Sequence, residues 1–187
     1  MDKPAKPTKA QLADAHTRVV PDIIAPDLQV LFCGINPGLY SAATGHHFAR
    51  PGNRFWPTLY RAGFTPHLFG AQQEAKLLSL GYGITNIVTR ASAAAAELSK
   101  TELQGGALEL IRKVEHYKPE VLAILGISAY RAAFKMPKAK LGLQSLKINS
   151  THIFVLPNPS GLNAHFPPDA LAQVFSDFRV FSDTLHF

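Results

Sequence analysis

An apolar run that ends in a glycine-flanked Asn-Pro turn constrains this chain more than any other stretch. The run Leu28–Cys33 is followed directly by Gly34-Ile35-Asn36-Pro37-Gly38. Such a run is typical of a buried parallel strand, and open α/β sheets bind their ligands at the carboxyl ends of strands. Pro37 fixes its own φ and keeps Asn36 out of the α region, so the Asn36 amide is held in one place. The turn therefore indicates either a ligand-facing amide or a plain strand-to-helix turn.

Residues 44–56 favour the ligand-facing interpretation. They set polar side chains among aromatic rings: Thr44, His46, His47, Asn53 and Arg54 among Phe48, Phe55 and Trp56. A loop that only turns does not require that mixture. A pocket of amides and rings suits a flat heterocycle that stacks on Phe48 and is hydrogen-bonded at its edge. Two alternatives stay open: the rings of Phe48 and Trp56 could belong to the core, and both histidines could serve packing.

Composition describes one compact domain. The chain has 187 residues, 47% of them hydrophobic and 17% charged, which fits a single globular domain over 20–187. Residues 1–19 are expected to be a flexible basic tail. No apolar stretch approaches the ~20 residues of a membrane span and no signal peptide is evident, so we expect a soluble, cytoplasmic protein without a membrane partner.

Charge and cysteine content narrow the chemistry. The formal charge is +6 and the pI about 9.6, which favours a polyanionic partner. The only cysteine, Cys33, excludes an intrachain disulfide and a cysteine-ligated zinc or iron–sulfur site. The chain also has no G-x-S-x-G, GxGxxG or Walker A motif, and His46 and His47 are adjacent rather than at metal-ligand spacing.

Strand and helix patterns alternate along the chain. Strands are expected at 28–33, 82–88, 121–125 and 151–156, and helices at 53–63, 71–80, 128–134 and 170–183, with another opened by the Ser99/Glu102 capping box. Residues 135–147 are expected to be a basic loop, either a solvated face or a phosphate track. The alternation predicts a three-layer α/β/α domain with a mostly parallel central sheet. The Asn-Pro loops after the first and last strands are expected to face each other across one crevice.

Five motifs in order resemble one enzyme family. GINPG, GHHF, PGNRFW, GITNIV and NPSGL, between about Pro21 and the terminal helix, resemble the mismatch-specific uracil/thymine-DNA glycosylases of the uracil-DNA glycosylase superfamily. The resemblance implies a uracil-DNA glycosylase-like fold and a monomer that acts without metal or cofactor. It also implies an enzyme of base excision repair that binds double-stranded DNA and cleaves the N-glycosidic bond of a flipped, mismatched or damaged pyrimidine.

The same resemblance assigns the base pocket. Asn36 matches the catalytic asparagine that positions the attacking water, and Phe48 the ring that stacks on the flipped base. Ser41 matches the residue that faces the pyrimidine 5-position, and Asn86 a position that is asparagine in the eukaryotic thymine glycosylases. The full set for the base pocket is Ile35, Gly38, Ser41, His47, Phe48, Asn53 and Asn86.

The NPSGL motif matches the loop that enters the duplex. Its DNA-binding set is Asn158, Ser160, Gly161, Leu162 and Asn163, with Leu162 as the wedge and Ser160 as a phosphate contact. Relatives place an arginine in this loop, whereas this chain continues Asn163-Ala164-His165. The resemblance therefore leaves a strand-gripping cation unassigned, for which His165, Lys147 and Lys140 are candidates.

Two other classes of function stay open at the level of sequence. One is a noncatalytic module that binds damaged DNA or a nucleotide, and the other is an enzyme acting on free nucleosides. An intact Asn36 argues against the first, and a loop leucine in a basic protein argues against the second. The lesion is also open: uracil opposite guanine, or thymine, ethenocytosine or an oxidised pyrimidine.

Overall fold

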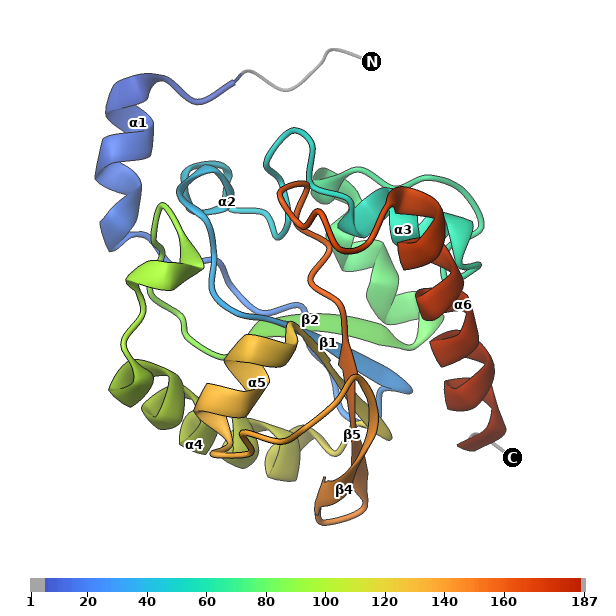
Figure 1. Ribbon diagram of the computed structural model, residues 1–187. Coiled ribbons are helices and arrows are strands. Elements are labelled where there is room, and N and C mark those ends of the chain that lie inside the picture. The colour runs from blue at the N-terminus through green and yellow to red at the C-terminus, as the bar shows by residue number, and fades with distance from the viewer. Residues whose placement is uncertain (1–5, 186–187) are drawn as a thin grey trace.

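The computed structural model describes residues 6–185, and its centre is a five-stranded sheet (Figure 1). The strands are β1 Val30–Gly34, β2 Tyr82–Asn86, β3 Val121–Leu125, β4 Gly142–Ile148 and β5 Thr151–Leu156, in the order β2-β1-β3-β5-β4. The first three strands and β5 are parallel, and only β4 runs antiparallel, to β5. The predicted mostly parallel sheet is confirmed.

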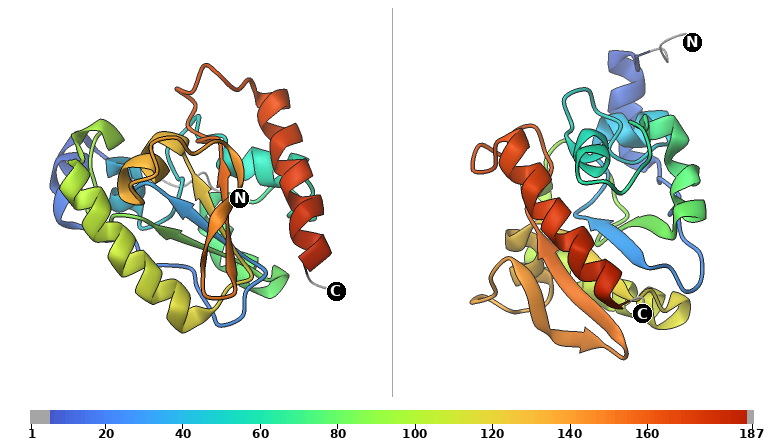
Figure 2. Two further views of the ribbon diagram at one scale, coloured as in Figure 1. Left: turned by 60° about the horizontal axis from the view of Figure 1, so that its bottom comes forward. Right: turned by 90° about the vertical axis from the view of Figure 1, so that its right-hand side faces the viewer.

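Helices cover both faces of the sheet (Figure 2). On one face lie α3 Phe55–Arg61 and α6 Pro168–Leu185, and on the other α4 Lys100–Tyr117 and α5 Ile127–Ala133. Side chains alternate along β1, so that Val30 and Phe32 pack under α3 and α6 whereas Leu31 and Cys33 pack under α4. This alternation builds two separate cores and confirms the three-layer α/β/α class.

The carboxyl ends of four parallel strands meet at one edge. The register pairs Gly34 with Asn86 and Cys33 with Ile124, which in turn pairs with Val155. The chain passes from β1 to β2 on one side and then crosses to β3 on the other side of β1. Such a change of direction opens a crevice at the carboxyl edge, which is where ligands bind in open α/β sheets.

Three segments differ from the sequence-based expectation. Residues 142–147 of the expected basic loop belong to the edge strand β4, whose mostly exposed residues give no buried strand pattern. Residues 71–80 form a 3-10 helix, η2 Ala71–Leu80, rather than an α-helix. The expected helix 53–63 is shortened to α3, because the Asn53 side chain accepts from the Phe55 N–H just before the first turn.

The N-terminal segment is more structured than a tail. Residues 1–5 of the expected tail lie outside the described residues, but α1 Lys9–Asp14 is a helix with a capping box and η1 Ala15–Thr17 follows it. Ala15 is fully buried against Val20, Ala42 and Ala91. Two short elements, α2 Leu39–Thr44 and η3 Ala95–Glu97, complete the fold. Within residues 6–185, no helix is long and apolar enough to cross a bilayer.

Candidate active site

A cavity of about 160 Å³ lies at the carboxyl edge of the sheet, where the loops after β1, β2, β3 and β5 converge. It is lined by Gly34, Ile35, Asn36, Pro37, Gly38, Ser41, His47, Phe48, Arg50, Asn53, Asn86, 92–95, Leu125, Asn158 and Ser160. All the residues predicted for the base pocket line this cavity together with Asn36. The expectation that the two Asn-Pro loops share one crevice is also confirmed, because both contribute to its wall.

The Asn36 amide has one orientation. Its Nδ2 donates to the Arg90 carbonyl at 2.9 Å and to Ser92 Oγ at 2.8 Å. Ser92 Oγ in turn donates to the Ala94 carbonyl at 2.8 Å, so it accepts from Asn36. Both partners are acceptors, which fixes Nδ2 as the anchored atom and leaves Oδ1 as an acceptor at the cavity. Ser92 is only 1% exposed, and sequence reasoning did not single it out.

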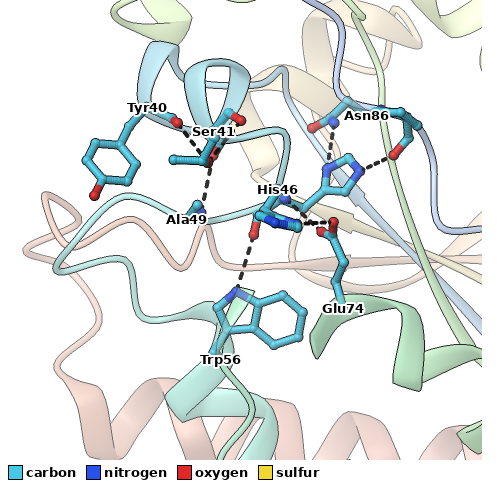
Figure 3. Close-up of polar contacts among 10 residues, drawn as sticks. Tyr40, Ser41, His46, Ala49, Trp56, Glu74 and Asn86 are labelled. Atoms are coloured by element: carbon cyan, nitrogen blue, oxygen red, sulfur yellow. Dashed lines mark hydrogen bonds and ion pairs between the residues drawn. The ribbon is translucent and has the colours of Figure 1, made fainter. Parts of the chain in front are cut away.

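A second amide, Asn86, is oriented through a buried histidine (Figure 3). His47 Nε2 lies 2.9 Å from the Pro21 carbonyl, which only accepts, so this nitrogen carries the proton. His47 Nδ1 is then the acceptor for Asn86 Nδ2 at 3.3 Å, and Asn86 Oδ1 is left without a donor from His47. Burial lowers the pKa of His47, which keeps the ring neutral and preserves this arrangement at neutral pH.

Gly34 makes room for that amide. A Cβ at this position would lie 2.5 Å from Asn86 Oδ1 and 3.2 Å from the end of the Phe48 ring. The glycine at the end of β1 therefore lets Asn86 and Phe48 approach the same corner of the cavity.

Phe48 is held in a strained backbone conformation. Its φ is 52°, in the left-handed region that side chains larger than glycine or asparagine rarely adopt. Its ring stacks on the buried ring of Phe55, with centroids 4.0 Å apart, and Phe48 also lines the cavity. Strain of this kind tends to persist at functional sites, where surrounding contacts maintain it. Trp56 is a core residue, and its Nε1 donates to the His47 carbonyl.

Glu74, in η2, holds the His46–His47 segment in place, and this role was not predicted from the sequence. Its carboxylate accepts from the His47 N–H at 2.7 Å and contacts His46 Nδ1 at 2.8 Å (Figure 3). His46 therefore faces Glu74 and is not part of the cavity wall. Ser41 fixes the other side of Phe48, because its Oγ accepts from the Ala49 N–H. The sequence gave no signal of this role, because both partners of Glu74 lie 27 and 28 residues away along the chain.

The NPSGL loop carries an exposed leucine on a braced backbone. Asn158 Oδ1 accepts from the Ser160 N–H, and Asn163 Nδ2 donates to the Asn158 carbonyl. Leu162, at the tip, is 80% exposed. Gly161 touches the neighbouring loop, since a Cβ there would lie 2.4 Å from the Gly52 carbonyl oxygen. Gly161 and Leu162 line a cleft next to the cavity, whereas Asn163 lines a different cleft, which shares Ile35 and Asn158 with the cavity.

Arg54 holds this loop in place. Its guanidinium donates to the carbonyls of Phe166, Ser160 and Asn163, across more than a hundred residues of sequence. Its own N–H donates to the Pro159 carbonyl at 3.0 Å. The PGNRFW motif gave only a polar candidate at Arg54, because carbonyl partners leave no mark on a sequence.

None of the three candidate cations for the loop, His165, Lys147 and Lys140, lines the base cavity or the cleft that contains Leu162. His165 lines an adjoining cleft that shares Ile35 and Asn158 with the base cavity, and Lys147 Nζ lies 3.3 Å from His152 Nε2 on the β4–β5 hairpin. Within the described part of the chain, no three His, Cys, Asp or Glu side chains form a group able to hold a metal ion.

Comparison with known proteins agrees with this architecture. The solution NMR structure of a candidate uracil DNA glycosylase from Methanosarcina acetivorans superposes with a TM-score of 0.57 at 17% identity, over 87% of this chain and 98% of that one. At this identity the likeness concerns the fold. The family model of the uracil DNA glycosylase superfamily matches residues 21–179, which is most of the chain. The chain therefore belongs to the uracil DNA glycosylase superfamily.

Proposed function

We propose that this protein is a monofunctional DNA glycosylase that flips uracil out of a G·U mismatch and hydrolyses its N-glycosidic bond. Thymine opposite guanine, or a modified pyrimidine, would be a further substrate. Membership of the superfamily supports the glycosylase activity. The observation that carries the proposal is the Asn36 amide, whose Nδ2 is doubly anchored and whose Oδ1 is free at the cavity.

The chemistry assigned to Asn36 is the positioning of water. Oδ1 accepts a hydrogen bond from a water molecule and orients its oxygen toward C1′ of the flipped nucleotide. The C1′–N1 bond breaks with its electron pair going to the base, and the water oxygen bonds to C1′ and releases a proton. That proton passes through solvent to the base anion, so the products are the neutral free base and an abasic site. An amide is a weak base, so the barrier is lowered mainly by orientation and by stabilisation of the departing base anion. Slow turnover is expected.

The pocket wall favours uracil over cytosine. Phe48 offers a rigid ring for stacking, and Asn86 Oδ1 offers an acceptor whose Nδ2 is already engaged with His47. Uracil has a donor at N3–H that can use this acceptor, whereas N3 of neutral cytosine is itself an acceptor and would be repelled. Ser41, on the same wall, is assigned the neighbourhood of the pyrimidine 5-position, where it would affect the tolerance of a methyl group.

Leu162 supports duplex DNA rather than a free nucleoside as the substrate. Leu162 is 80% exposed, so its side chain adds little to the stability of the folded protein. It lines the cleft next to the base cavity. Inserted into the stack, it would fill the space that the flipped nucleotide leaves. A mismatched pyrimidine costs less to extrude than a paired one, which contributes to selectivity.

The test is a single-turnover assay on labelled duplexes containing one G·U, A·U or G·T pair, with single-stranded uracil DNA beside them. Alkali-revealed strand breaks report base release. The proposal expects release from G·U to exceed release from A·U. Equal release from every uracil substrate would remove the mismatch preference, and binding without any release would favour a noncatalytic DNA-binding module.

A further inference from the structure

The loop between Phe48 and α3 carries an arginine, Arg50, close to the loop of residues 158–165, which has none. We call residues 158–165 the wedge loop. Arg50 lines the mouth of the base cavity and also the neighbouring cleft that contains Leu162. The segment 163–165 reads Asn-Ala-His, so the wedge loop itself provides no arginine. Arg50 is thus the basic residue common to both hollows.

A tight turn fixes the backbone of Arg50. The Asn53 N–H donates to the Arg50 carbonyl at 3.0 Å, with Pro51 and Gly52 as the central residues and a φ of 84° at Gly52. Pro followed by a glycine with positive φ is the pattern of a type II turn. Gly161 packs directly on Gly52, so this turn and the tip of the wedge loop touch backbone to backbone.

Two arginines of this segment differ in what they contact. Arg54 is half-buried, and its guanidinium donates hydrogen bonds to three carbonyls in and next to the wedge loop. Arg50 is exposed, and within residues 6–185 its guanidinium makes no hydrogen bond or ion pair. An arginine held beside a cleft without an internal partner is available to an external anion.

We propose that Arg50 binds a backbone phosphate next to the flipped nucleotide and so supplies the strand-gripping cation that segment 163–165 lacks. This rests on the proposed function, because the phosphate is placed by the flipped base. With the base in the cavity and Leu162 in the stack, the sugar–phosphate between them lies along the rim that Arg50 shares. Neither His165 nor Lys147 lines the cleft that contains Leu162, so they are not assigned this contact.

The experiment measures binding across a salt series. The probe is a duplex with 2′-fluoro-2′-deoxyuridine opposite guanine, which resists cleavage because the fluorine disfavours positive charge at C1′. The variants are Arg50→Gln, Arg50→Lys and the matched control Arg112→Gln. Arg112 is an exposed arginine on α4 that pairs with Glu109 and lines neither the base cavity nor the cleft with Leu162, so this change removes the same charge away from both.

Arg50→Gln is expected to raise the dissociation constant about tenfold at low salt. Loss of one phosphate contact also lowers the salt dependence, so the ratio between the variant and the wild type shrinks by about 3.5-fold between 50 and 200 mM salt. Arg50→Lys should keep most of the affinity, since a phosphate accepts a point charge. Arg112→Gln should bind like the wild type.

Two outcomes overturn the inference. Arg50→Gln that binds like Arg112→Gln shows that no phosphate is held. The other is a loss of affinity in both Arg50→Gln and Arg50→Lys that is absent when adenine stands opposite the lesion. That result would assign Arg50 to the opposite guanine and not to a phosphate. Failure of the proposed function looks different: the wild type then releases no base from any duplex, whatever Arg50 does.

Discussion

The cavity wall and the wedge loop are fixed by different kinds of contact. Asn36 and Asn86 are oriented by hydrogen-bond partners, among them the buried Ser92 and His47, that set which amide atom faces the cavity. The wedge loop is braced through its own backbone carbonyls and Arg54, while Leu162 at its tip stays in solvent. A catalytic amide needs its lone pair oriented before the substrate binds. An intercalating side chain needs only a rigid backbone beneath it and an exposed position.

The largest effect is expected from crowding the cavity wall. Gly34→Ala puts a Cβ 2.5 Å from Asn86 Oδ1, so the amide or the Phe48 ring must move. Base release from G·U should fall by about a hundredfold, and stability by about 1–3 kcal/mol. The measurements are single-turnover cleavage and chemical denaturation.

Gly105→Ala is the matched control for Gly34→Ala. A Cβ at Gly105 meets nothing within 4 Å inside α4, so this change should raise stability by about 0.5–1 kcal/mol and leave cleavage unchanged. An unaffected Gly34→Ala enzyme would mean that Asn86 and Phe48 do not need their present positions.

A smaller effect is expected from loosening Asn36. Ser92→Ala removes one of the two acceptors of Asn36 Nδ2, while the Ser92 N–H to Pro37 carbonyl bond at 3.1 Å keeps the backbone in place. The rate of base release should drop about tenfold with DNA affinity unchanged, because only orientation is lost. Ser92→Thr keeps the hydroxyl and should restore the rate; a loss of affinity in place of rate would indicate a structural role.

The wedge loop should respond in a substrate-dependent way. Leu162→Ala is expected to lower release from duplex G·U by about fivefold to tenfold and to leave release from single-stranded uracil unchanged, since only the duplex has a stack to open. The melting temperature should not change, because the side chain is exposed. Leu108→Ala, at an exposed leucine of α4, is the control; equal losses on both substrates would remove the wedge role.

The smallest expected effect is the pH dependence of the free energy of unfolding. The pKa of His47 is lowered by burial below its ordinary 6.5, so the unfolded chain takes up a proton before the folded protein does. The stabilisation is complete above pH 6.5 and is lost as the pH falls below it, at no more than about 1.4 kcal/mol per pH unit. Urea denaturation between pH 8 and 5 measures this slope.

His152 adds a contribution of the same sign, since burial and Lys147 also lower its pKa. The His152→Gln variant therefore isolates His47. A flat profile in that variant would show that His47 does not stay neutral in the folded protein.

Sequence reasoning succeeded where the information is local. The run before Asn36 predicts β1, and the GINPG and NPSGL motifs predict two loops that do line or flank one cavity. The sequence did not predict roles or elements that depend on contacts between residues far apart in the chain. Arg54 binds carbonyls more than a hundred residues away, and the Glu74 carboxylate accepts from the His47 N–H, 27 residues away. The edge strand β4 exists because β5 offers it hydrogen bonds, and its own residues are mostly exposed.

The most direct test of the account is the single-turnover rate of Asn36→Ala on a G·U duplex. The account predicts a rate at least about a hundredfold below that of the wild type, with affinity for the 2′-fluoro duplex changed less than about threefold. Asn149→Gly, which removes an amide at the positive-φ turn between β4 and β5, should cleave normally. Base release by Asn36→Ala at the wild-type rate would contradict the central claim.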